Sequence, residues 1–118
     1  MQREPRKYLW DARKAAGAIA DFTRGKSFDD FRQDILLRSA VERQFEIIGE
    51  ALGQLAKSHP EIAANVPDLP RIVAFRNILI HGYAAIDQET VWRVVQENLP
   101  ALDASLAALL EAGNEPKK

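Results

Sequence analysis

Four side chains that could handle a phosphate group lie within eight residues of one another. They belong to the segment RNILIHGY and are Arg76, Asn77, His81 and Tyr83. Asn77 and His81 are four residues apart, so on a helix they share one face, and Arg76 lies about 100° around from Asn77. If the helix ends at Gly82, Tyr83 can turn back towards either group. The segment can therefore bring all four groups together.

Such a set suits cleavage of a phosphodiester. An imidazole with a reference pKa near ~6.5 can remove or return a proton, and a guanidinium can bind a non-bridging phosphate oxygen. RNA supplies its own nucleophile, the 2′-hydroxyl, so neither a metal nor another cofactor is required. Taken alone, however, the residues favour a simpler interpretation, in which Arg76 and His81 cap helix carbonyls and pair with carboxylates.

The elements that must position these residues are predicted to be helices. Apolar residues recur at three- and four-residue steps, and strand-like alternation is absent. Pro60 ends one periodic run, Gly82 ends another, and Pro100 should kink the last. The expected fold is all-α, an antiparallel four-helix up-down bundle in a single domain 1–118 with a core of about 6–111 and a tail at 112–118. The expected helices are 6–23, 28–57, 70–81 and 88–111, with a loop or short turn at 58–69.

The second expected helix carries more apolar surface than one neighbour needs. This helix therefore lies at the centre of its bundle or also contacts a second subunit, and both readings stay open. Gly49 and Gly53 could permit a close helix approach, as across a dimer interface. The main stripe comprises Phe31, Ile35, Val41, Phe45, Ile48, Leu52 and Leu55, and Leu36, Ala40, Ile47 and Ala51 widen it.

Composition excludes several classes of site. The chain has no cysteine, which rules out disulfides and thiolate chemistry, and its formal net charge is −1. Residues 1–26 carry seven Lys or Arg against three Asp or Glu, which indicates either a solvated helix face or a patch that faces phosphates. No run of apolar residues is long enough for a signal peptide or a membrane span, so we expect a cytoplasmic protein.

Other polar and aromatic residues have simpler interpretations. His59 is expected to be structural or exposed, and no metal site is expected, because the one carboxylate series, Glu42, Glu46 and Glu50, lacks a histidine partner. Glu46 or Glu50 could instead orient Arg76 or be solvated, and solvation is slightly favoured for Glu46. Trp10 and Trp92 could stack on RNA bases, but packing in the core or at an interface is the favoured interpretation, since both lie in expected helices beside apolar residues.

The motif resembles that of a known family. Arg76–His81 is similar to the Arg-polar-x3-His motif of HEPN ribonucleases, and Gly82-Tyr83 completes the Arg-x4-His-x-Tyr form of HepT-like toxins. Three further stretches agree in order and spacing: Phe45–Ala51, Val91-Trp92 after Asp87, and Leu99–Leu102. The resemblance covers roughly residues 6–110.

The resemblance implies a HEPN fold and a homodimer, in which two copies of the motif form one RNA-cleaving cleft. It implies the toxin subunit of a toxin–antitoxin system, with Arg76, Asn77 and His81 as catalytic residues. An MntA-like minimal nucleotidyltransferase antitoxin would neutralise it by adenylylation of Tyr83, since an added AMP would block the cleft and compete for Arg76. The alternative from a different class is a non-catalytic module that binds a nucleotide or a partner.

Overall fold

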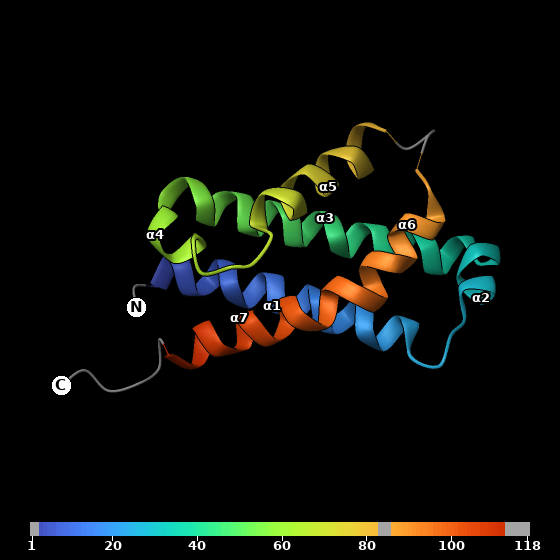
Figure 1. Cartoon of the computed structure of the whole chain (residues 1–118), viewed down its shortest axis with the longest axis horizontal. Coiled ribbons are helices and arrows are strands. Elements are labelled where there is room, and N and C mark those ends of the chain that lie inside the picture. Colours follow the sequence, from blue (N-terminus) through green and yellow to red (C-terminus); the bar gives the residue numbers. More distant parts are fainter. Residues whose placement is uncertain (1–2, 83–85, 113–118) are drawn as a thin grey trace.

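The computed structural model describes residues 3–82 and 86–112, and within these ranges every regular element is helical (Figure 1). The all-α prediction is therefore confirmed for the part of the chain that the structure describes. No helix in these ranges is long and apolar enough to cross a bilayer. The elements are α1 Arg3–Thr23, α2 Phe28–Gln33, α3 Ile35–Ser58, α4 Pro60–Ala63, α5 Leu69–His81, α6 Gln88–Arg93, the π-helical turn η2 Val94–Asn98, and α7 Leu99–Ala112.

Helix α3 is the central element. It packs against α1 and α5, while α1 also packs against α7, and Figure 1 shows α5 and α7 on opposite sides of the α1–α3 pair. The apolar stripe of α3 thus finds most of its partners within the chain, as the central-helix reading expected. Completely buried side chains from three of these helices meet in this core: Leu9, Ile19, Ile48, Leu52, Leu55 and Leu106.

The expected helix 28–57 is two helices, because Asp34 interrupts it. Asp34 has an extended backbone (φ −105°, ψ 98°), and its carboxylate accepts a hydrogen bond from the Leu37 N–H at 3.1 Å, so it caps a new helix start. The interruption changes the helical phase. Ile35 and Leu36, which were placed in or beside the main stripe, are 71% and 77% exposed.

The expected start of that segment at residue 28 is confirmed, and Ser27 caps it. The Ser27 hydroxyl accepts from the Asp30 N–H at 3.1 Å, and the Asp30 carboxylate accepts from the Ser27 N–H at 2.9 Å. This reciprocal pair lowers the pKa of Asp30, mainly because the backbone hydrogen bond from Ser27 stabilises the charged form. The short helix α2 therefore begins at a capping box, and it ends where the Asp34 backbone N–H donates to the Phe31 carbonyl.

The last expected helix, 88–111, contains a π-helical turn directly before Pro100. Pro100 has no N–H to donate to the preceding turn. The Leu99 N–H bonds to the carbonyl of Val94, five residues earlier, which is the wider spacing of a π-turn. The expected irregularity thus takes the form of η2, between α6 and α7.

Candidate functional site

Helix α5 carries the candidate residues and is seated on α3 by two contacts. The rings of Phe75 and Phe45 meet edge to face, with centroids 5.2 Å apart. One residue further on, the Arg76 side chain crosses buried Gly49, where a Cβ atom would lie 2.6 Å from Arg76 Cγ. The close approach expected at Gly49 is therefore to α5 of the same chain.

The head group of Arg76 is held by two hydrogen bonds. Its Nη2 donates to Glu50 Oε2 at 2.8 Å, and its Nη1 donates to Asn77 Oδ1 at 3.1 Å. The Nε atom is buried and has no hydrogen-bond partner among the described residues. Because a guanidinium has five N–H donors, Nη1 and Nη2 each keep a second N–H for an incoming anion.

Asn77 is oriented by Arg76. A guanidinium is only a donor, so the Asn77 oxygen must face it and the Asn77 Nδ2 group must point away. Asn77 is exposed, and its amide can therefore donate to a bound phosphate beside the Arg76 head group. The expected pairing of Arg76 and Asn77 in one site is in line with this geometry.

His81 is the last residue of α5, and its side chain is exposed. The helix ends there as expected, since the Gly82 N–H closes the final turn on the Ile78 carbonyl at 2.7 Å. A Cβ at position 82 would lie 2.9 Å from that carbonyl oxygen, so crowding favours glycine. Tyr83 lies outside the described residues.

A groove runs beside Arg76 between α1, α3 and α5. Its volume is about 530 Å³. Of the α5 residues, Arg76 and Ile80 line this groove, whereas Asn77 and His81 do not. On a helix Asn77 lies about 100° and His81 about 140° around the axis from Arg76. The lining residues are Lys7, Tyr8, Asp11, Arg43, Glu46, Ile47, Glu50, Ala51, Gln54, Arg76 and Ile80.

The charges of the groove are balanced in pairs. Besides Arg76 with Glu50, Lys7 lies 3.5 Å from Asp11 and Arg43 lies 3.3 Å from Glu46. Lys7, Tyr8 and Arg43 were not among the residues singled out from the sequence. The basic N-terminal region was the one signal for Lys7, but which face of α1 meets the motif depends on packing.

The carboxylates of α3 have separate partners. Glu50 orients Arg76, whereas the mostly buried Glu46 pairs with Arg43 rather than Arg76. Within the described ranges no three His, Asp or Glu residues converge in a way that could hold a metal ion. Of the two candidates for orienting Arg76, the structure thus selects Glu50.

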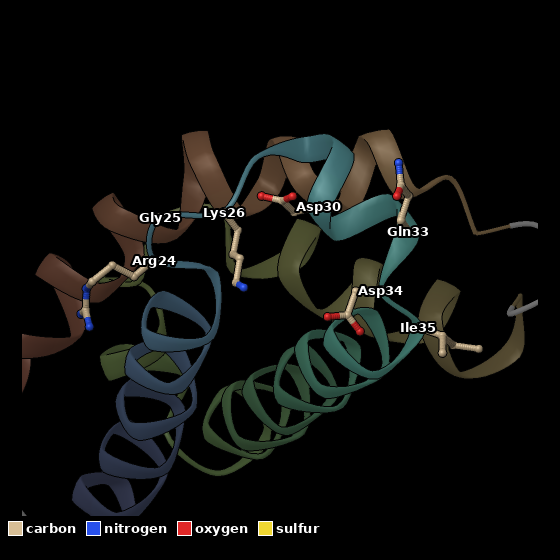
Figure 2. A pocket seen from close by; sticks show the side chains of 7 residues that line it. All are labelled: Arg24, Gly25, Lys26, Asp30, Gln33, Asp34 and Ile35. Carbon is tan, nitrogen blue, oxygen red and sulfur yellow. The ribbon is translucent and has the colours of Figure 1, made fainter.

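A second hollow, of about 540 Å³, lies at the connection between α1 and α2 (Figure 2). No residue of α5 lines it. Its two carboxylates, Asp30 and Asp34, are engaged in capping α2 and α3. This hollow therefore has its acidic groups committed to helix ends and is separate from the motif.

The remaining candidates divide between packing and exposure. Trp92 packs on Phe31 with ring centroids 5.2 Å apart, as expected. Trp10 is 55% exposed, so it does not pack in the core of this chain, whereas packing at an interface stays a prediction. His59 is largely shielded and lies 3.9 Å from Glu61, which is in keeping with the structural reading.

Comparison with known proteins adds to this geometry. Residues 12–109 match a model of the family described as "Ribonuclease HepT-like". The chain belongs to the HepT-like ribonuclease family. A protein of Thermococcus cleftensis named "Probable ribonuclease HepT" is 33% identical over 92% of this chain and 98% of its own length. One of Methanocaldococcus jannaschii named "Putative RNase MJ1380" is 35% identical over 86% and 92%. No solved structure matches.

Membership of the HepT-like family confirms the resemblance and the assignment to a family of ribonucleases. The structure also explains one stretch that carried the resemblance, Phe45–Ala51. Phe45 contacts Phe75, Gly49 contacts Arg76, and Glu50 bonds to Arg76. This segment of α3 thus forms the surface against which the motif of α5 packs.

Proposed function

We propose that this chain is the toxin subunit of a toxin–antitoxin system and acts as a metal-independent endoribonuclease. Arg76 and Asn77 bind the scissile phosphate, and His81 transfers the proton. The single observation that carries the proposal is Arg76 at a groove wall, hydrogen-bonded to Asn77 on the same helix as the exposed His81. Membership of the HepT-like family supports RNA as the substrate.

The proposed reaction uses the 2′-hydroxyl of RNA as nucleophile. His81 removes the hydroxyl proton, the 2′-oxygen bonds to the adjacent phosphorus, and the bond to the 5′-oxygen breaks as that oxygen takes a proton. The products are a 2′,3′-cyclic phosphate and a 5′-hydroxyl. Free N–H groups of Arg76 and Asn77 face the charge that grows on the non-bridging oxygens.

The proposal includes an up-down four-helix arrangement and a homodimer with one composite cleft. One groove holds three cations and three carboxylates, so it has no excess positive charge. Two facing grooves double the number of free Arg76 N–H groups around one phosphate and supply a second His81 as proton donor to the 5′-oxygen. Ile78, 55% exposed on α5 beside the motif, supports an interface there.

Tyr83 is the proposed control point. An MntA-like nucleotidyltransferase antitoxin would form a bond between the Tyr83 oxygen and the α-phosphate of ATP, with release of pyrophosphate. The attached AMP carries an anionic phosphate two residues from His81, where it competes with RNA for Arg76. Mass spectrometry after incubation with partner and ATP should show the added AMP on wild type and not on Tyr83→Phe.

The test of catalysis is cleavage of RNA by the purified protein in EDTA. Wild type should give products ending in a 2′,3′-cyclic phosphate, and His81→Ala should lose about 100-fold or more in rate. His59→Ala, which changes the chain's other histidine, is the matched control and should cleave like wild type. Equal cleavage by wild type and His81→Ala would contradict the assignment.

A non-catalytic module that binds a nucleotide or a partner is the second candidate. The ion pair of Arg76 with Glu50 favours it, because the pair already neutralises the main phosphate-binding charge. Such a module would bind RNA or ATP equally well in wild type and His81→Ala, and would cleave neither. The cleavage assay therefore separates the two functions.

A further inference from the structure

The outward face of α1 holds an exposed aromatic ring beside a recess. Trp10 is 55% exposed, whereas its neighbour Leu9 is completely buried. The recess, of about 320 Å³, lies between α1 and α7, which pack side by side. It is lined by Arg6, Trp10, Arg13, Ala107, Leu110 and Glu111. An indole face beside an open hollow is a platform on which a planar ring can stack.

Cations surround this tryptophan. Lys7 and Lys14 lie three residues before and four residues after Trp10, which puts them on the same face of α1. Arg6 and Arg13 line the recess itself. The pattern of an exposed ring between basic side chains is typical of surfaces that bind single-stranded nucleic acid.

The nearby carboxylates hold these cations only loosely. Asp11 lies 3.5 Å from Lys7, and Asp103 lies 3.8 Å from Arg13, with all four side chains well exposed. Glu111 lines the recess. Exposed pairs at such distances are weak, so a phosphate can replace the carboxylate at little cost. Arg6 is fixed instead, since its Nη1 donates to the Leu110 carbonyl at 2.9 Å.

Lys7 lies between this surface and the candidate active site. Lys7 lines the groove that contains Arg76, and it follows Arg6, which lines the recess beside Trp10. An RNA chain that leaves the groove over Lys7 therefore reaches the indole of Trp10 by crossing α1. The basic N-terminal region, whose role the sequence left open, lies on this path.

We infer that the outer face of α1 is a nucleotide subsite, where an unpaired base of single-stranded RNA stacks on Trp10 and its phosphates contact Lys7, Arg13 and Lys14. The inference rests on the proposed function, because it extends the RNA beyond the cleavage site. A duplex cannot use the subsite, since its bases are already stacked and paired. The subsite anchors substrate and does not touch the reacting atoms.

Fluorescence tests the stacking directly. Trp92→Phe leaves Trp10 as the only tryptophan of the chain, and adding His81→Ala prevents cleavage during the titration. Titration with a short unlabelled single-stranded RNA should quench the Trp10 emission. The same sequence in a duplex should leave the emission unchanged. An unchanged Trp10 emission at RNA concentrations that saturate binding in an anisotropy assay would overturn the inference.

Affinity provides the second measurement, with a matched control on the same helix. In the His81→Ala background, Trp10→Ala should weaken binding of a labelled single-stranded RNA about 5- to 100-fold, and Trp10→Phe should keep most of the affinity. Phe22 is also exposed on α1, at 38%, and Phe22→Ala should leave the Kd unchanged. Equal Kd values for Trp10→Ala and Phe22→Ala would reject the subsite.

The outcomes separate this inference from the proposed function. In otherwise wild-type protein, Trp10→Ala should raise KM and leave kcat unchanged, because it acts on binding alone. Quenching of Trp10 without any cleavage by wild type would reject the ribonuclease proposal and keep the RNA subsite. If wild type cleaves RNA and Trp10→Ala leaves its KM unchanged, the ribonuclease proposal stands and the subsite is rejected. Absence of RNA binding by the His81→Ala protein would overturn the subsite.

Discussion

The side chain of Arg76 lies across Gly49, where a Cβ atom would approach Arg76 Cγ to 2.6 Å. Gly49→Ala should therefore displace Arg76 and reduce RNA cleavage. Overpacking costs about 1–3 kcal/mol, and the gain in helix propensity offsets only about 1 kcal/mol, so the variant should also unfold more easily. Thermal unfolding and the cleavage rate measure the two effects.

The control for this prediction is Gly17→Ala in α1. A Cβ at position 17 meets no heavy atom of the described residues within 4 Å. This variant should gain stability of about 0.5–1 kcal/mol and cleave RNA like wild type. A Gly49→Ala variant that stays active and has a raised Tm would contradict the close packing of Arg76 on Gly49.

Glu50→Gln and Glu46→Gln make the same charge change in the same groove. Both should tighten RNA binding roughly two- to fivefold at low salt, since each removes one negative charge near the phosphates. Glu50 bonds to Arg76 and Glu46 to Arg43, so only Glu50→Gln should also lower kcat. Steady-state kinetics at several salt concentrations check this split. Equal kcat values for the two variants would mean that Glu50 does not position Arg76.

Glu42→Gln should stabilise the fold at neutral pH. Burial raises the pKa of Glu42, because it penalises the charged carboxylate, while a hydrogen bond from Gln88 acts in the opposite direction. A folded-state pKa above the unfolded value gives a contribution that is present below the unfolded pKa and lost as pH rises through the folded pKa. Glutamine imitates the neutral acid at every pH.

Thermal unfolding from pH 7 down to pH 4 checks this sign. The Tm of Glu42→Gln should exceed that of wild type at pH 7, and the difference should shrink as the pH falls and wild-type Glu42 takes up its proton. The exposed Glu61 provides a control, since Glu61→Gln should show no such convergence. A Tm advantage that grows on acidification would contradict the burial argument.

Ile78→Lys should separate the proposed homodimer. Ile78 is 55% exposed on α5, next to Asn77, and a lysine there would leave an unpaired charge buried in the interface, which opposes association. Light scattering after gel filtration should show a monomer, and cleavage should fall with it. Phe22→Lys, a charge placed on another exposed apolar residue, should leave both unchanged. A dimeric, active Ile78→Lys would place the interface elsewhere.

The helix ends and the site were predictable to different degrees. Periodicity and the stop at Gly82 predicted the end of α5 at Ile80 or His81, and it lies at His81, because both signals are local. Local sequence signals could not decide whether Glu46 or Glu50 contacts Arg76. The two lie one turn apart on α3, and which of them meets Arg76 depends on how far α5 slides along α3. That register is set by Phe45 and Gly49, whose partners the sequence does not reveal.

Two differences between the expectations and the structure have local causes. Apolar residues continue across Asp34, so the pattern showed no interruption, and only the capping bond to the Leu37 N–H reveals the break. Trp10 follows the buried Leu9 by one residue, which rotates it about 100° away from the core stripe. Its apolar neighbours along the helix suggested packing in the core or at an interface, while its position on the helical wheel favours exposure within the chain.

The interruption at Asp34 also creates a region with its own stability. Helix α2 has six residues, and Phe31 is its buried side chain, held by the ring of Trp92. Its opening therefore requires the loss of few contacts compared with the α1–α3 core. Amide protons of α2 should exchange with solvent by local opening, faster than those of α3. This end of the molecule can thus unfold and refold while the contacts of α3 with Arg76 stay intact.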